Sequence, residues 1–194
     1  MMQIITRELS RLEREALERH LLTLGDEDRR LRFGVALPDQ AIRDYVARID
    51  FEIDAVFGVF DDELQLVAAA HLARCHAHAE LGLSVLAAWR GRGVGAALLA
   101  RSHTHARNWG ICRLFMHCLS ENAAMMHLAR KQGMRVCASN DEADAWLELP
   151  PADASSYTSQ VLDERVGVFD YALKSQRRAV RRIASALLLK PATA

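Results

Sequence analysis

The feature that most constrains this chain is a glycine-rich turn between a strand-like segment and a helix-like segment. Residues 79–86 alternate small or polar side chains with apolar ones, as a strand does, and residues 93–109 have the pattern of a helix that Gly110 ends. Three glycines occupy alternate positions at the junction: Gly91, Gly93 and Gly95. Glycine lets a backbone turn tightly and leaves no Cβ in the way of a ligand. The amides of residues 92–96 can then face an anion at the positive end of a helix, so the segment predicts an α/β fold with a phosphate site.

Two arginines beside the turn, Arg90 and Arg92, add positive charge and favour an anionic ligand. Two other phosphate-binding motifs are excluded. Counting from Gly91, the third glycine of a dinucleotide-binding fingerprint is replaced by Ala96. A P-loop requires Lys followed by Ser or Thr after its last glycine, where this chain has Ala96 and Ala97. A glycine-rich turn that binds nothing remains an alternative, because short motifs also match by chance.

Composition limits the class of protein. The chain has 194 residues, of which 51% are hydrophobic and 26% charged, and this indicates one folded domain with at most a terminal extension. Its apolar runs are too short to cross a bilayer, no apolar signal core follows the N-terminus, and the four cysteines form no CxxC pair. These features predict a cytoplasmic protein with reduced thiols and no membrane partner.

Charge is unevenly distributed, although the net charge is zero. Residues 71–140 carry nine Lys or Arg and two acidic residues, so this third of the chain is basic. Such an excess suits a nucleic acid, a phosphate or a polyanionic cofactor. A surface for single-stranded nucleic acid needs exposed aromatic side chains among the arginines. Only Trp109 and Phe115 are candidates, and both occupy positions that a core would use, so we expect a polyanionic cofactor and no nucleic-acid partner.

Hydrophobic periodicity and turn residues predict the order of elements along the chain. Ser10 and Glu13 have the spacing of a capping box, which begins a helix that Gly25 ends. The predicted elements are, in chain order, a strand at 4–5, helices at 10–24, at 26–32 and from 38, strands at 55–60, 64–75 and 79–86, a helix at 93–109, a strand at 111–119, a helix capped by Ser120 that runs to Gln132, strands at 134–139 and 145–149 joined across 140–144, and a helix at 154–189.

The glycine-rich turn resembles a known motif. Arg90-x-x-Gly93-x-Gly95, preceded by a strand end at Val85, resembles the CoA-binding motif of the GNAT acetyltransferase superfamily. A second segment strengthens the resemblance. The helix that begins near Asn122 resembles the second signature helix of that superfamily, which usually ends in Gly-Phe where this chain has Gly133 and Met. The order of strand, turn, helix, strand, Asn-bearing helix and strand also matches.

The resemblance is closest over residues 55–149 and implies an α/β fold with a mixed, mainly antiparallel sheet flanked by helices. We expect residues 1–150 to form the acetyltransferase domain and residues 151–194 a helical C-terminal extension. The resemblance also implies acetyl-CoA as co-substrate and an amine of a small molecule or peptide as acceptor. In this superfamily the strand before the turn splays from its neighbour, and the pantetheine arm lies in the gap like an added strand. The cofactor-binding residues are then expected to be Leu83, Ser84, Val85, Arg90, Gly91, Arg92, Gly93, Val94, Gly95, Ala96 and Asn122.

Acetyl transfer to an amine requires removal of a proton, because an alkyl amine with a pKa of about 10 is protonated at neutral pH. Some members of the superfamily place a catalytic glutamate on the strand before the turn, where this chain has Glu80. The alternative for Glu80 is a surface carboxylate with no catalytic role. Many members carry a tyrosine acid in the Asn-bearing helix, but Leu128 or His127 occupies that position here. Ser120 or water is then left to protonate the thiolate.

Other interpretations remain open. A catalytically silent acyl-CoA-binding sensor or regulatory module would keep the turn without needing a carboxylate near the thiol. His71, Cys75, His76 and His78 are close in sequence, and His76 and His78 share a face of a strand, but no fourth ligand stands at a known zinc spacing, so we expect no metal. The basic, amphipathic C-terminal helix can pack on the domain or join two copies in a homodimer.

Overall fold

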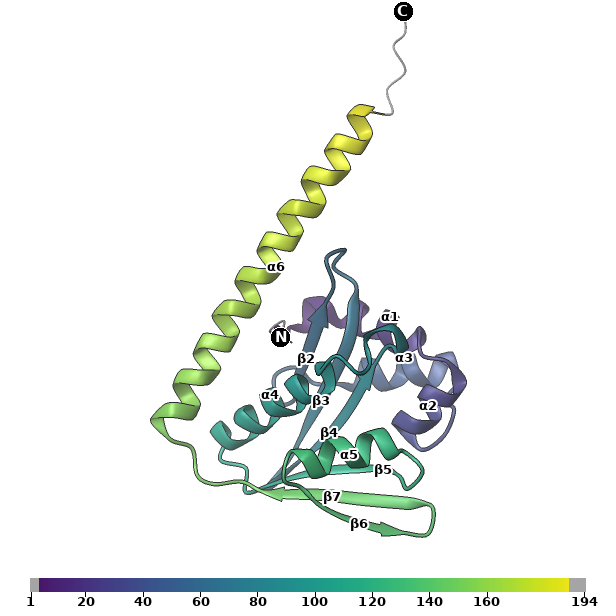
Figure 1. Cartoon of the computed structure of the whole chain (residues 1–194), viewed down its shortest axis with the longest axis vertical. Coiled ribbons are helices and arrows are strands. Elements are labelled where there is room, and N and C mark those ends of the chain that lie inside the picture. The colour runs from purple at the N-terminus through teal and green to yellow at the C-terminus, as the bar shows by residue number, and fades with distance from the viewer. Residues whose placement is uncertain (1–3, 189–194) are drawn as a thin grey trace, which may run out of the picture.

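The structure is a computed structural model and describes residues 4–188 of the chain. Seven strands form one sheet, and helices cover both of its faces (Figure 1). The elements are, in chain order, β1 (Arg7–Leu9), η1 (Arg11–Glu13), α1 (Arg14–Leu22), α2 (Asp26–Phe33), α3 (Asp39–Arg48), β2 (Ala55–Phe60), β3 (Leu66–Cys75), β4 (His78–Val85), η2 (Ala87–Trp89), α4 (Val94–Asn108), β5 (Arg113–Leu119), α5 (Ala123–Lys131), β6 (Arg135–Ser139), β7 (Glu142–Glu148) and α6 (Ala154–Leu188).

The strand order is β1-β2-β3-β4-β5-β7-β6. Every neighbouring pair is antiparallel except β4 and β5, which run parallel. A parallel pair needs a crossover connection, and α4 supplies it. The predicted mixed, mainly antiparallel sheet flanked by helices is therefore confirmed.

The central strands are buried on both faces, which explains their continuous apolar sequences. Along β2, Phe57 belongs to the core under α4, whereas its neighbour Val56 belongs to the core under α1 and α3, and both are fully buried. Successive side chains of a strand point to opposite faces, so one apolar run fills two cores. The glycine-rich turn lies where β4 leaves this double-sided core and α4 begins.

The helix α6 lies along one side of the domain and then extends beyond it (Figure 1). Gly167 lies so close to β1 that an added Cβ would be 2.6 Å from the carbonyl oxygen of Thr6. Further along, the ring of Tyr171 packs edge-on against Phe60, and Lys174 donates to the carbonyl of Phe60 at 2.8 Å. Within residues 4–188, no helix is both long and apolar enough to span a membrane.

The capping box at Ser10 and Glu13 is confirmed, since both of its hydrogen bonds are present. The first strand, predicted to open at residues 4–5, begins instead at Arg7, where its pairing with β2 starts. The predicted turn at 140–144 is too long, because β7 already begins at Glu142. The predicted end of the last helix at residue 189 lies outside the described residues.

The start of α5 also differs from the prediction. Ser120 does not cap this helix, because its hydroxyl donates to the carbonyl of Asn140 at 3.0 Å and so ties the end of β5 to the β6–β7 turn. Asn122 is the cap, and its side-chain oxygen accepts from the amide of Met125 at 3.1 Å. Both residue types favour helix caps. The β-hairpin that holds Ser120 decides between them, and this contact is invisible in the local sequence.

Candidate functional site

The parallel strands β4 and β5 separate soon after they meet. They pair at only three positions, the last of which joins Glu80 to Phe115. The remaining part of β4, from Leu81 to Val85, has β3 on one side and no partner strand on the other. An unpaired strand edge offers its backbone N–H and C=O groups to an extended ligand. The splay that the sequence resemblance predicted is therefore present.

A pocket of about 470 Å³ lies over this free edge and the glycine-rich turn, and we call it the first pocket. It brings together ten of the eleven predicted cofactor-binding residues, with Arg92 as the exception. The pocket is lined by Leu24, Asp28, Leu31, Arg32, Leu83, Ser84, Val85, Trp89, Arg90, Gly91, Gly93, Val94, Gly95, Ala96, Asn122, Ala124, Met125, His127, Leu128 and Lys131.

The turn has the backbone geometry that an anion site needs. Gly91 and Gly93 have φ angles of +72° and +86°, in the left-handed region, and a Cβ added at either would meet no atom within 4 Å. The space beside them is therefore open to a ligand. Gly93 also begins α4 without any side-chain cap, so the leading amides of this helix have no intrahelical acceptor. A phosphate or pyrophosphate placed there would receive these hydrogen bonds together with the positive end of the helix dipole.

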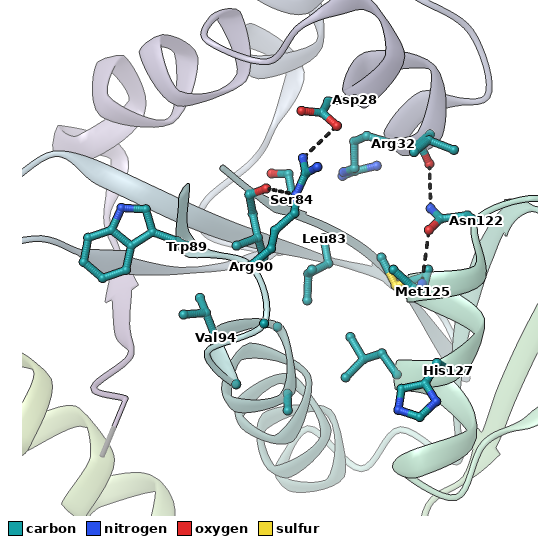
Figure 2. A pocket seen from close by; sticks show the side chains of 18 of the residues that line it. Asp28, Arg32, Leu83, Ser84, Trp89, Arg90, Val94, Asn122, Met125 and His127 are labelled. Carbon is teal, nitrogen blue, oxygen red and sulfur yellow. Dashed lines mark hydrogen bonds and ion pairs between the residues drawn. The ribbon is translucent and has the colours of Figure 1, made fainter. Parts of the chain in front are cut away.

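The two arginines of the turn differ in their contacts. Arg90 donates from Nε to the carbonyl of Val85 at 3.0 Å, and its Nη2 lies 2.7 Å from a carboxylate oxygen of Asp28 (Figure 2). It therefore links the turn to α2 across the first pocket. Arg92 lies over the ring of Trp89 instead, with its guanidinium carbon 5.2 Å from the ring centroid. Lys131, at the end of α5, supplies a further cation to the first pocket that the motif comparison did not single out.

Asn122 lines the first pocket and is held by two hydrogen bonds (Figure 2). Its side-chain oxygen caps α5, and its Nδ2 donates to the carbonyl of Leu31 in α2 at 3.4 Å. Because this second bond is long and therefore weak, Nδ2 is the group of Asn122 that a ligand can take over. In its present position Asn122 joins the two helices that face each other across the first pocket.

The buried side chain of Ser84 is held by a histidine of α1, on the face of the sheet opposite α4. His20, in α1, is 3% exposed, and its Nδ1 lies 2.9 Å from the carbonyl of Leu66. A carbonyl can only accept, so Nδ1 carries the proton and Nε2 accepts from the hydroxyl of Ser84 at 2.8 Å. Burial lowers the pKa of His20 to about 4, and the nearby Arg32 acts in the same direction. His20 is therefore neutral at neutral pH and holds one strand of the first pocket in place.

A second pocket of about 300 Å³ adjoins the first and shares Leu31 and Arg32 with it. It lies at the point where β4 and β5 diverge, under the C-terminal end of α2. Its residues come from α2, α3, β3, β4 and β5, and they include several titratable side chains. It is lined by Leu31, Arg32, Phe33, Gly34, Tyr45, His71, Ala73, Glu80, Leu81, Gly82, His117, Cys118 and Leu119.

The predicted base Glu80 lies in the second pocket and not in the first. It is exposed, and strand alternation places it on the same face as Gly82 and Ser84, as the sequence suggested. His71 faces the same side, because it is the direct partner of Gly82 across β3 and β4. Ser120, the other predicted catalytic residue, lines neither pocket.

Arg32 stands between the two pockets. Its guanidinium packs directly on Gly82, where an added Cβ would lie 1.9 Å from Nη2. It also donates to the hydroxyl of Tyr45 at 3.1 Å. In the described part of the chain, no carboxylate forms an ion pair with Arg32 within 4 Å. Because Gly82 has no side chain, the guanidinium of Arg32 can lie against β4 where this strand separates from β5.

One group of possible metal ligands occurs within the described residues, away from both pockets. Glu8, His105 and Glu164 place ligand atoms within 4.8 Å of one another. Arg101 occupies the middle of this group, 3.2 Å from Glu164 and 3.7 Å from Glu8. The buried guanidinium already supplies the positive charge that these carboxylates need, so the group is an ion-pair cluster that joins α4, β1 and α6.

Sequence reasoning did not select several residues that line the two pockets, above all Asp28, Arg32, Tyr45, His71 and Lys131. Asp28, Arg32 and Tyr45 belong to α2 and α3, where the motifs give no information. Tyr45 and His71 are 26 positions apart and meet only because α3 packs on β3. The one available signal was the presence of three arginines, at positions 29, 30 and 32, and of Tyr45 outside the stretch 55–149 that most resembles the superfamily.

Comparisons with known proteins agree with this geometry. The sequence profile of the Acetyltransferase (GNAT) family matches residues 10–134. No curated protein matches the chain by sequence. Among solved structures, the GNAT domain of S. lividans PAT superposes with a TM-score of 0.64 at 21% identity, covering 74% of this chain and 89% of that one.

Two further similar structures contain a cofactor. A putative acetyltransferase from Salmonella typhimurium, solved with acetyl-CoA, has a TM-score of 0.59 at 17% identity and covers 79% of this chain and 98% of that one. Spermidine N-acetyltransferase from Vibrio cholerae, solved with CoA and spermine, has a TM-score of 0.61 at 16% identity and covers 75% of this chain and 95% of that one. At these identities the likeness shows a shared fold.

Proposed function

This chain belongs to the GNAT acetyltransferase family, and we propose that it transfers an acetyl group from acetyl-CoA to an amine of a small molecule or peptide. The observation that carries the proposal is the splay of β4 from β5 directly above a glycine turn that opens a helix. A free strand edge suits the amide-containing pantetheine arm, and uncapped helix amides suit a pyrophosphate. These two features occur in one pocket.

The residues present fit this co-substrate. Left-handed glycines with open space beside them can approach a pyrophosphate closely, and Lys131, Arg90 and Arg32 supply cations at different points of the first pocket. Acetyl-CoA supplies an activated acetyl group as a thioester, and the protein supplies position and proton transfer. The second pocket, which opens at the end of the free strand edge, is then the place for the acceptor amine. Its exposed carboxylate, Glu80, suits a cationic amine before it loses a proton.

Calorimetry with acetyl-CoA, followed by a CoA-release assay on a panel of amines, tests this function. We expect saturable acetyl-CoA binding, a raised melting temperature and CoA release with at least one amine. Absence of acetyl-CoA binding would overturn the proposal. Binding without CoA release from any amine would favour the catalytically silent sensor or regulatory module instead. The absence of a tyrosine at the position of Leu128, which packs on Gly95, is the observation that keeps this second candidate under consideration.

A second copy of this chain is the proposed protein partner, bound through the extension formed by α6. The face of this helix turned away from the domain carries apolar residues at alternating spacings of four and three, which is the heptad pattern of a coiled coil. Each of these apolar side chains is at least 36% exposed, and they are Leu162, Val166, Phe169, Leu173, Val180 and Ile183. The polar Gln176 takes the heptad position between Leu173 and Val180.

Charge along α6 favours an antiparallel pairing of the two copies. The first half of the helix carries three acidic residues, Asp163, Glu164 and Asp170, and one basic residue, whereas the second half carries five basic residues and no acidic one. An antiparallel arrangement places the acidic half of one helix beside the basic half of the other. The domain lies on the opposite face of α6, where Gly167 and Lys174 contact β1 and β2, so it does not obstruct this face.

Sedimentation measurements at several salt concentrations test the dimer. We expect a dimer that weakens as salt is added, because the charges that align the helices are screened. Phe169→Glu should yield a monomer that still binds acetyl-CoA. Val168→Glu is the matched control, because Val168 is similarly exposed, at 60% against 66% for Phe169, but lies off the apolar stripe, and it should leave the dimer intact. A monomeric wild-type protein at high micromolar concentration would overturn the pairing.

A further inference from the structure

Four polar side chains form a continuous chain of hydrogen bonds along the wall of the second pocket. Arg32 donates to the hydroxyl of Tyr45 at 3.1 Å, and this hydroxyl lies 2.7 Å from Nδ1 of His71. Nε2 of His71 lies 3.1 Å from a carboxylate oxygen of Asp54. The other oxygen of Asp54 accepts from the amide of Arg74 at 3.0 Å, which fixes the carboxylate. The chain joins α2, α3, β3 and the residue that precedes β2.

The chemistry of the partners fixes the direction of these hydrogen bonds. A carboxylate can only accept, so Nε2 of His71 carries the proton and donates it to Asp54. Nδ1 is then unprotonated, and it accepts a hydrogen bond from the hydroxyl of Tyr45. The oxygen of Tyr45 accepts from Arg32, which has no proton-accepting group of its own. A proton that reaches the Tyr45 oxygen can therefore move in only one direction along this chain, toward His71.

We propose that Tyr45 takes the proton from the acceptor amine and passes its own proton to His71, with Asp54 as the group that orients the imidazole. This inference rests on the proposed function and names the base for it. Tyr45 and His71 both line the second pocket. Both ring nitrogens of His71 already have partners, Tyr45 and Asp54, so Tyr45 is the member that touches the acceptor, and His71 and Asp54 act through it. The arrangement uses the N-terminal helices for catalysis as well as for acceptor binding.

The proton balance of the step is as follows. The ammonium form of the acceptor loses one proton to the Tyr45 oxygen as the phenol proton moves to Nδ1 of His71, and the imidazolium later releases it to water. The neutral nitrogen attacks the thioester carbonyl, so a C–N bond forms and the C–S bond breaks. The sulfur leaves with the electron pair of that bond. The second proton of the nitrogen ends on this thiolate, so the products are the amide, the CoA thiol and one released proton.

The surroundings of His71 keep it ready to accept a proton. Burial lowers the pKa of His71 below its ordinary value, and this effect exceeds the opposing influence of Asp54. The charged groups that face it are Asp54, Arg32 from α2 and Glu80 from β4, of which Arg32 lowers the pKa and the two carboxylates raise it. His71 is therefore neutral at neutral pH, and its two carboxylate neighbours stabilise the imidazolium that forms in the reaction.

A purely structural role is the main alternative, because the same hydrogen bonds attach α3 to the sheet. Glu80 is the rival base, but it is exposed, and none of the hydrogen bonds among the described residues uses its carboxylate. We therefore assign Glu80 to attraction of the cationic amine, which affects KM more than kcat.

The test compares three variants, after the amine panel has found an acceptor for the wild-type protein. Tyr45→Phe removes only the hydroxyl and keeps the ring that packs edge-on against Phe33. His71→Gln can still accept from Tyr45 and donate to Asp54, but it cannot bind a proton. Glu80→Gln removes the rival carboxylate. We expect kcat to fall by about a hundredfold or more for the first two variants, the usual size of a general-base contribution.

Further readouts separate proton transfer from structure. For Tyr45→Phe and His71→Gln, acetyl-CoA affinity and melting temperature should stay near wild type, and activity should recover as the pH approaches the pKa of the amine. Glu80→Gln should raise the KM for the amine with little change in kcat. Wild-type kcat in His71→Gln, or a hundredfold loss of kcat in Glu80→Gln alone, would overturn the relay while leaving acetyl transfer standing. A wild-type protein that acetylates no amine would overturn the proposed function first, and the relay with it.

Discussion

The two adjoining pockets are built in opposite ways. Half of the residues that line the first pocket come from one continuous stretch of chain, from Leu83 to Ala96, and this stretch offers the proposed co-substrate mainly backbone groups. The second pocket is made from side chains of five separate elements, and the hydrogen bond between Tyr45 and His71 spans 26 positions of sequence. A backbone site tolerates variation in side chains as long as its glycines remain. A side-chain site changes with every substitution, so a family can keep one cofactor and vary its acceptor.

The glycine turn provides the strongest test of this contrast. Gly93→Val should lower acetyl-CoA affinity by about a hundredfold or more, because a β-branched residue does not adopt a φ of +86° and the leading amides of α4 would turn away. Calorimetry measures the affinity, and circular dichroism checks the fold. Arg92→Ala is the matched control, since Arg92 lies in the same turn but outside the first pocket. Equal losses in both variants would count against a site made of backbone amides.

His20, which holds Ser84 in the wall of the first pocket, should make the stability of the protein depend on pH. Its pKa is about 4 in the folded chain against an ordinary 6.5, so between these values the unfolded chain binds the proton and the folded chain does not. Stability should therefore fall as the pH drops through this window, by about 3 kcal/mol at most from this residue.

Denaturant titrations from neutral pH to pH 4 measure this effect. His20→Gln should lose less stability on acidification than the wild type, and the remaining loss should include His105, whose pKa burial also lowers to about 4. His127→Gln is the control, because His127 is exposed. An unchanged pH dependence in His20→Gln would show that His20 is not the buried neutral group described above.

A substitution at Gly82 tests whether Arg32, which lies between the two pockets, positions the relay. In Gly82→Ala the new methyl group would displace the guanidinium of Arg32 from the strand and from Tyr45. We expect kcat to fall about tenfold, since small displacements of positioning groups have effects of this order or larger. Arg32→Ala should reproduce the loss, and acetyl-CoA affinity should change much less than kcat. A Gly82→Ala enzyme with wild-type kcat would show that Arg32 does not position the relay.

The smallest expected effect concerns the ion pair between Asp28 and Arg90. The carboxylate of Asp28 occupies Arg90 and places a negative charge on the wall of the first pocket. Asp28→Asn should therefore raise acetyl-CoA affinity by a few fold, and the gain should shrink with added salt, as expected for half-exposed charges. Glu27→Gln, one position earlier and outside the pocket, is the control. A weaker affinity in Asp28→Asn would show that the ion pair shapes the pocket instead of competing with the ligand.

Features carried by a local stretch of sequence could be predicted, whereas features that depend on contacts between distant residues could not. The family, the mixed sheet, the splay of the strand before the turn and the residues that the turn contributes to the first pocket could be predicted because a local motif carries them. The cap of α5 could not, since Ser120 and Asn122 are both good caps and only the contact of Ser120 with Asn140 decides between them. The placement of Glu80 on the face shared with Gly82 followed from strand alternation, whereas its location in a different pocket from the glycine turn did not.

The sequence by itself determined the glycine turn, the strand before it and the helix after it, because backbone conformation and alternation are local properties. It also predicted a long C-terminal helix that is basic and amphipathic. Only the tertiary structure brought Arg32, Tyr45, His71 and Asp54 into one chain of hydrogen bonds, and only it placed the guanidinium of Arg32 on Gly82. The physical reason is that hydrogen bonds between side chains depend on distances of about 3 Å. Such distances arise from the packing of helices on the sheet, which no local pattern of residues encodes.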